Sequence, residues 1–213
     1  MRTKTKALAL ALCAVLLVVS TVFVTMAFLT DRDSVKNTFT FGQVGISLDE
    51  ADVDVNGVVE DGENRKSTEG RVQANEYHLI PGHNYVKDPT IHVDSTSEDC
   101  WLFVKLENGL KPIVAGNATF SENDPSGSVY TIEAQMEKNG WTCVDTTNNI
   151  WAYGSVASKN AHVDVFDKFE LMENANVSLY GEAVINLTAY AVQADGFATA
   201  TDAWEATSAN FLG

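Results

Sequence analysis

The sequence is poor in basic side chains, and this scarcity limits the partners that the protein can have. Its 213 residues include 14 lysines and arginines against 29 aspartates and glutamates, which gives a formal net charge of −15. Nucleic acids and anionic lipid surfaces are bound through clusters of basic residues. The composition therefore argues against both as partners. Two interpretations of the acidity stay open: solubility outside the cell, and uptake of divalent cations.

Motifs of the common enzyme classes are also missing. There is no His-Glu-x-x-His, no glycine-rich phosphate loop and no Ser-His-Asp signature. The four histidines are His78, His83, His92 and His162, and none of their spacings defines a shared site. A zinc site gathered from distant strands stays open as an alternative. The sequence favours a protein without catalytic residues and without a required cofactor.

Cysteine is scarce as well. Of the three, Cys13 falls in the apolar N-terminal run, which leaves Cys100 and Cys143. There is no Cys-x-x-Cys, so nothing indicates a redox site. In an exported protein the two cysteines could form a disulfide worth about 4 kcal/mol on the chain-entropy estimate. Two free buried thiols are the alternative.

Only one long hydrophobic run occurs, at the start of the chain. Three basic residues within the first six positions precede residues 7–29, which carry no charge. A basic start, an apolar run and small residues at a cut site are typical of a secretory signal peptide. Thr25 and Ala27 fit the positions before a cut between Ala27 and Phe28. The sequence therefore predicts a signal peptide over 1–27 and export through a signal peptidase. The competing interpretation is an uncleaved helix, which would be the protein's only contact with a membrane.

The rest of the chain, residues 28–213, is dominated by short alternating segments. The clearest are 37–48, 100–108, 162–172 and 183–195, with shorter ones at 128–136, 140–144 and 149–156. Two more strands, 77–80 and 83–93, are expected on either side of a turn. Pro81 and Gly82 fit the centre of a type II turn. Residues 49–76 read as a long acidic loop, and the tail near Trp204 as a helical turn. The pattern predicts a single all-β domain, an antiparallel β-sandwich with long acidic loops behind an N-terminal signal helix.

A calcium-binding spacing occurs inside the acidic loop. Asp52, Asp54, Asn56 and Glu63 occupy positions 1, 3, 5 and 12 of the EF-hand loop pattern, and the Val58 carbonyl would fill position 7. These oxygens could surround a Ca²⁺ ion. The flanking sequence does not read as the two helices of an EF-hand, so a solvated acidic turn is the alternative.

Four segments together resemble a known family of exported Gram-positive proteins. They are the leader running into "AFLTD", then "NTFTFGQVGISL", "LIPGHNYVKDPTIHV" and "LTAYAVQADGF". This pattern is similar to that of the TasA/camelysin (CalY) family, whose members carry a SipW-type signal peptide. Its most specific element is PG-x-x-x-x-KD, here Pro81, Gly82, Lys87 and Asp88.

The resemblance implies a jelly-roll-like sandwich and a structural role at the cell surface or in the biofilm matrix. In fibre-forming relatives the freed N-terminal segment completes the sheet of the next subunit, which makes residues 28–42 a candidate donor strand. Pairing of that strand within its own domain is the alternative. Camelysins have been classed as metalloendopeptidases, so a secreted protease is a second functional expectation. A Ca²⁺-stabilised surface or adhesion module is the third.

Overall fold

The structure is a computed structural model that describes residues 30–33, 44–59 and 70–212. The predicted signal peptide and its cut site at Ala27 and Phe28 lie outside these residues. The described chain consists mostly of antiparallel strands, with two α-helices and two short 3₁₀ segments. The prediction of an all-β protein is therefore confirmed. None of the helices in this part of the chain is long and apolar enough to cross a membrane.

One layer is a five-stranded sheet with the order β1-β11-β6-β8-β7. Its strands are β1 (Thr30–Asp33), β11 (Ile185–Gln193), β6 (Cys100–Asn108), β8 (Ile150–Tyr153) and β7 (Trp141–Asp145). All neighbours run antiparallel, and β6 and β11 pair along nine residues each. Both were predicted as strands, over residues 100–108 and 183–195, whereas the strand predicted over 162–172 is two short strands, β9 (His162–Asp164) and β10 (Lys168–Glu170), in different sheets.

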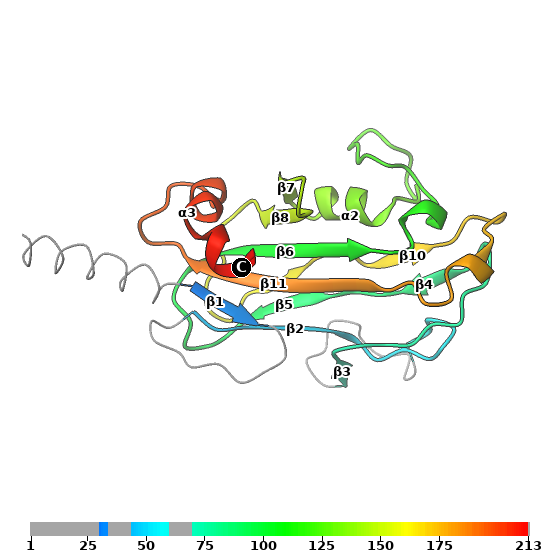
Figure 1. Cartoon of the computed structure of the whole chain (residues 1–213), viewed down its shortest axis with the longest axis horizontal. Helices are drawn as coiled ribbons and strands as arrows, with labels where there is room; N and C mark the ends of the chain where they lie inside the picture. The colour runs from blue at the N-terminus through cyan, green and yellow to red at the C-terminus, as the bar shows by residue number, and fades with distance from the viewer. Residues whose placement is uncertain (1–29, 34–43, 60–69, 213) are drawn as a thin grey trace, which may run out of the picture.

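The second layer contains a four-stranded and a two-stranded sheet (Figure 1). The order β3-β2-β5-β9 joins β3 (Arg71–Val72), β2 (Ile46–Ala51), β5 (Thr90–Val93) and β9 (His162–Asp164). Beside them, β10 (Lys168–Glu170) pairs with β4 (Asn84–Val86). Short 3₁₀ segments lie at η1 (Lys111–Ile113) and η2 (Val177–Leu179).

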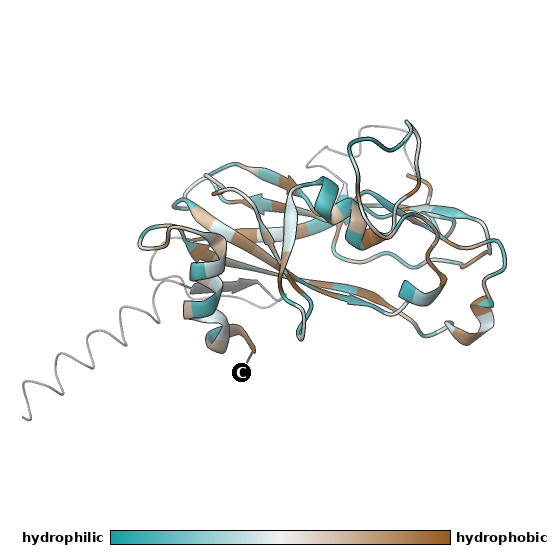
Figure 2. Ribbon diagram, turned by 90° about the horizontal axis from the view of Figure 1, so that it is seen from above, coloured by the Kyte–Doolittle hydropathy of each residue, from teal (hydrophilic) through white to brown (hydrophobic). Residues whose placement is uncertain are grey.

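Two hydrophobic clusters bury the two faces of strand β6. Leu102, Val104 and Leu106 join residues of both layers, including Ile46 and Ile91. Apolar residues thus recur along the long strands, and helix α3 (Ala200–Leu212) carries both apolar and polar positions (Figure 2). On the opposite face of β6, Trp101 and Phe103 pack with three residues from the C-terminal part of the chain, Tyr190, Trp204 and Phe211. The tail is therefore a helix of 13 residues that covers the sheet, longer than the single turn expected.

The predicted strand over 128–136 is wrong, because α2 (Ile132–Lys138) occupies most of it. The apolar positions 130, 132, 134 and 136 alternate, but Ile132 and Met136 are also four residues apart and face one buried cluster from a helix. Thr131 begins the helix as its N-cap, since its hydroxyl accepts a hydrogen bond from the Ala134 amide at 3.4 Å. The short segment fits both the two-residue period of a strand and the spacing of a helix, and the N-cap at Thr131 favours the helix.

Gln135 in α2 forms hydrogen bonds with five backbone groups through one side chain. Its Nε2 donates to the carbonyl oxygens of Tyr130 at 3.0 Å, Thr131 at 3.5 Å and Lys168 at 2.8 Å. Its Oε1 accepts from the backbone nitrogens of Asp167 at 3.1 Å and Lys168 at 3.3 Å. The side chain therefore ties α2 to the start of β10.

Replacing Gln135 by leucine should lower the free energy of unfolding by about 1–3 kcal/mol, because buried backbone groups lose their partners. Urea unfolding measures the change. Lys138→Ala at an exposed position of the same helix is the matched control, and we expect a change within about 0.5 kcal/mol. Equal effects of the two substitutions would contradict the role given to Gln135.

The Pro-Gly element forms the predicted turn. The amide of His83 donates to the Ile80 carbonyl at 3.1 Å, and Gly82 has φ +72°. A type II turn requires that positive φ, which glycine adopts without strain. The turn directs the chain into β4 and on to Lys87 and Asp88. Residues 77–80 before it, predicted as a strand, form no strand.

Candidate functional site: the β1–β11 edge and the adjoining cleft

Strand β1 forms the outer edge of the five-stranded sheet by pairing with part of β11. The register joins Thr30 to Val192 and Asp33 to Ala189, so β1 covers only the C-terminal half of β11. Among the described residues, nothing pairs with residues 185–188 on that side. In Figure 1, β1 lies beside β11 at the end of the sheet where α3 and the C-terminus are found. An edge strand that begins the described chain is the element that the sequence singled out as a donor strand.

A cleft of about 900 Å³ lies where the pairing of β1 stops. Its lining includes residues 185–188 of β11, residues 48–50 of β2, the segment 73–79, and residues near η2. Apolar side chains contribute much of the lining, from Leu48, Tyr77, Leu79, Leu110, Val177, Tyr180, Ile185 and Leu187. A half-paired edge beside an apolar cleft is the kind of surface that accepts an extended peptide, because backbone groups and side-chain pockets are both available.

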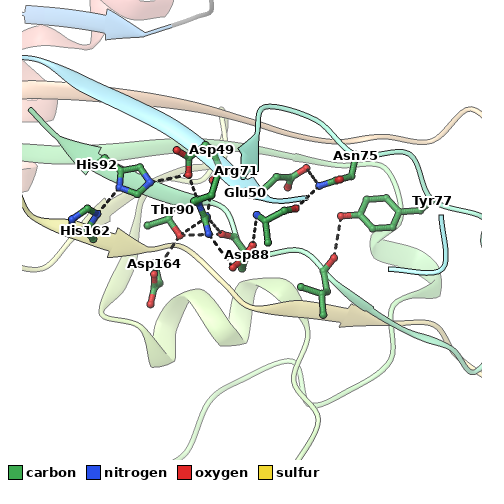
Figure 3. Close-up of polar contacts among 12 residues, drawn as sticks. Asp49, Glu50, Arg71, Asn75, Tyr77, Asp88, Thr90, His92, His162 and Asp164 are labelled. Carbon is green, nitrogen blue, oxygen red and sulfur yellow. Dashed lines mark hydrogen bonds and ion pairs between the residues drawn. The ribbon is translucent and has the colours of Figure 1, made fainter. Parts of the chain in front are cut away.

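Beside the cleft, Arg71 holds three strands of the second layer together (Figure 3). Its Nε bonds the Asp49 carboxylate and its Nη1 lies 3.4 Å from Asp88 Oδ2. Its Nη2 donates to the Asp88 carbonyl at 2.9 Å and to Thr90 Oγ1 at 3.0 Å. Only 4% of the arginine side chain is exposed. The guanidinium thus fixes the start of segment 71–77 against β2 and β5.

A second buried ion pair lies between that cluster and the cleft. Lys87 Nζ donates to Glu50 Oε2 at 2.5 Å, and Asn75 Nδ2 donates to Glu50 Oε1 at 2.9 Å. The Tyr77 ring lies near the ammonium, 5.9 Å from Nζ to its centroid. Burial raises the pKa of Tyr77 well above its usual value, and the negative charges of Glu50 and Asp88 add to the rise. The tyrosine is therefore neutral and donates to the Val86 carbonyl at 3.0 Å.

The last two residues of the sequence element PG-x-x-x-x-KD thus bind buried partners in the second layer. Lys87 binds Glu50, while Asp88 accepts from the Ala51 amide at 2.8 Å and contacts Arg71. Sequence reasoning missed the partners Glu50, Arg71 and Asn75, because they lie in a segment that read as a solvated acidic loop. Only the pairing of β2 with β3 and β5 brings them to the buried pair.

The structure brings two of the four histidines together. His92 and His162 face each other across β5 and β9, with their Nδ1 atoms 2.5 Å apart. Asp49 lies 2.8 Å from His92 Nε2, so that nitrogen carries the hydrogen that the carboxylate accepts. The remaining two, His78 and His83, flank the Pro-Gly turn. In residues 30–33, 44–59 and 70–212, no group of three or more His, Cys, Asp or Glu side chains is arranged to hold a metal ion.

The calcium candidates lie in a tight turn. The Asp54 carboxylate accepts from the Asn56 and Val58 amides, each at 2.9 Å, and Val53 bridges to Val59. Asp52 precedes the turn, whereas Glu63 lies outside the described residues. Both oxygens of Asp54 thus have donors within the loop, since Asn56 Nδ2 also reaches Oδ2 at 3.3 Å. The turn is held by its own hydrogen bonds.

The hydrogen bond from Val58, with smaller help from Asn56, lowers the pKa of Asp54. A carboxyl whose folded pKa is lowered stabilises the fold at pH values above its unfolded pKa and loses that contribution as pH falls through the folded one. We therefore expect the Val58 amide proton shift to titrate with a midpoint below the ordinary Asp value, as NMR would record. In Asp54→Asn this titration should vanish. A midpoint at or above the ordinary value would contradict the geometry.

Cys100 and Cys143 are both free thiols, of which Cys100 is buried and Cys143 partly buried. Cys143 pairs with Trp151, which pairs with Val104, four residues along β6 from Cys100. Two strand spacings and four residues separate the cysteines by about 16 Å. A disulfide needs Cα atoms within about 7 Å. The predicted intrachain bridge is therefore wrong, because both residues belong to one sheet but to distant positions in it.

Burial makes these thiols harder to ionise. It raises the pKa of Cys100 to about 12, with a further contribution from the charge of Asp99. Burial also raises the pKa of Cys143. Because the thiolate is the reactive form, Cys100 does not act as a nucleophile near neutral pH.

No family model, curated protein or solved structure matches this chain.

Proposed function

We propose that the protein is a secreted structural subunit of the cell surface or biofilm matrix, which assembles into filaments by exchange of its N-terminal strand. The observation that carries the proposal is the position of β1. It pairs with only half of the sheet edge at β11, next to an apolar cleft of about 900 Å³. The leader and the resemblance to TasA/camelysin proteins support the proposal of export and of a jelly-roll-like sandwich.

Exchange needs no new type of contact. A strand that pairs with β11 of its own chain can pair with β11 of a neighbour in the same register, so the same backbone hydrogen bonds form in either state. The contact is head-to-tail, because strand β1 of one molecule meets a different surface, the β11 edge, of the next. Head-to-tail contacts that do not close into a ring continue into a filament.

The apolar cleft gives the exchanged strand room to extend beyond the four residues of β1. Edge residues 185–188 and the β2 residues 48–50 both line it, so an incoming segment would contact both layers at once. Val184 and Leu179 add apolar side chains at this end of the molecule, 55% and 75% exposed. Exposed apolar side chains next to an unpaired edge favour association with another chain.

Negative-stain electron microscopy of the mature protein, with and without residues 28–42, tests the proposal. We expect filaments from the complete mature chain and none from the shortened one. Val55→Ser, which changes an exposed turn residue and leaves the strand intact, is the matched control and should still form filaments. If the complete chain stays monomeric at high concentration, the proposal fails.

A further inference from the structure

Lys87, Glu50 and Asn75 form a hydrogen-bonded cluster that lines the cleft. One carboxylate binds an amine through one oxygen and a side-chain amide through the other, at 2.5 Å and 2.9 Å. Glu50 is 3% exposed and Lys87 8%. Their positions come from three separate parts of the second layer: β2, segment 73–79 and the residue after β4. An ion pair that only neutralises Lys87 would not need the Asn75 amide at the same Glu50 carboxylate.

The amide orientation is fixed by its other bonds. Asn75 Nδ2 also donates to the Ala51 carbonyl at 2.9 Å, and Asn75 Oδ1 accepts from the Val53 amide at 3.1 Å. The amide nitrogen therefore faces Glu50, and the amide oxygen faces a backbone N–H. In an attack on the amide carbon, that N–H stabilises the negative charge that develops on Oδ1.

We propose that Lys87 and Asn75 form an intramolecular isopeptide bond, with Glu50 carrying the protons. Lys87 Nζ transfers one proton to Glu50 Oε2, which removes two charges from buried surroundings. The free amine then attacks Asn75 Cγ, forming the Nζ–Cγ bond. Glu50 gives its proton to Nδ2, the Cγ–Nδ2 bond breaks, and ammonia departs.

The reaction balances without any oxidant or co-reactant. Nζ gives up a second proton through Glu50, the departing ammonia takes it as ammonium, and the carboxylate ends ionised as it began. Lys87, Glu50 and Asn75 all line the cleft, so the leaving group has a route to solvent. Tyr77 lies beside the amine and stays neutral, because burial raises its pKa. It therefore does not compete with Glu50 for the proton of Lys87.

The product would close a ring over residues 75–87. That ring contains Tyr77 and the Pro-Gly turn, and it fixes segment 73–79, which forms part of the cleft. A covalent bond at this place would resist proteolysis and pulling forces independently of any assembly. The bond would form whether or not the protein assembles into filaments.

Mass spectrometry of the folded, exported protein tests the inference. Cleavage before aspartate gives a peptide of residues 61–87, which holds both Asn75 and Lys87. We expect its mass to be about 17 Da below the linear value, because one ammonia is lost. Trypsin should no longer cut after Lys87, and backbone fragments from between residues 75 and 87 should be absent.

Three variants make the test specific. E50Q removes the proton carrier, while K87R and N75A each remove one partner, and all three should give the peptide at its full linear mass. A succinimide at Asn75 would show the same mass loss but leave Lys87 open to trypsin, and that result would overturn the inference. Recovery of residues 61–87 at full mass from the wild-type protein would overturn it without any variant.

Discussion

An excess of a synthetic peptide with the sequence of residues 28–42 should stop filament growth. If a neighbour's N-terminal strand pairs with β11, the free peptide competes for the same edge and carries no domain that could continue the chain. Filaments should therefore shorten as the peptide concentration rises, until monomers and short oligomers dominate by mass action. Negative-stain microscopy and sedimentation measure the loss.

A scrambled peptide of the same composition is the control. It keeps the charge and the hydrophobicity but loses the alternation that places side chains on alternate faces of a strand. It should leave the filament length unchanged. Equal inhibition by both peptides would show that assembly responds to composition alone, and this would contradict strand pairing.

Replacing Arg71 by methionine should lower the free energy of unfolding by about 3–5 kcal/mol, because the buried Asp88 carboxylate and the partly buried Asp49 carboxylate lose their charged partner. Asp88 would still accept the hydrogen bond from the Ala51 amide, and Asp49 would still contact His92. Both carboxylates would lose their ion pair with the guanidinium. Arg71→Lys should recover only part of the loss, because an ammonium cannot reproduce the planar fork. Urea unfolding with matched slopes measures both changes.

The control for Arg71 is an ion pair at the surface. Lys105 Nζ lies 2.9 Å from Glu107 Oε1, and the two side chains are 32% and 54% exposed. Exposed pairs contribute about 0–1 kcal/mol, so Glu107→Gln should change the unfolding free energy by no more than that. If Arg71→Met proves as mild as Glu107→Gln, the buried cluster does not fix segment 71–77 as described.

The long strands could be predicted from the sequence because the side chains of their two faces alternate along the chain. Residues 100–108 alternate Leu102, Val104 and Leu106 with a second apolar set, and β6 has those same bounds. The Pro81–Gly82 turn could be predicted for a local reason as well, since glycine supplies the φ that the turn requires. Features that depend on a few neighbouring residues are visible without the fold.

The polar cluster could not be predicted in this way. Arg71 and Glu50 lie 21 positions apart in a segment rich in charges, and nothing local distinguishes them from solvated residues. Their burial follows from the register of β2 with β3 and β5, which is a long-range property. The helix α2 was missed for another reason: its apolar residues satisfy two periods, and the N-cap at Thr131 decides between them.

The proposed function thus depends on which molecule's sheet receives the N-terminal strand, and a pair of cysteines can answer this. Asp31 of β1 lies opposite Ala191 of β11 in the register. Cα atoms of opposite residues in an antiparallel pair are about 4.5–5.5 Å apart, which suits a disulfide. The measurement is non-reducing gel electrophoresis of filaments of Asp31→Cys/Ala191→Cys after mild oxidation, with each single variant as a control for Cys100 and Cys143.

If the strand is exchanged, each bond joins two molecules, and we expect a ladder of covalent oligomers that disappears on reduction. The single variants should give no ladder. If the strand pairs within its own sheet, the double variant will run as an oxidised monomer even when taken from the most concentrated samples. That result would contradict assembly by strand exchange.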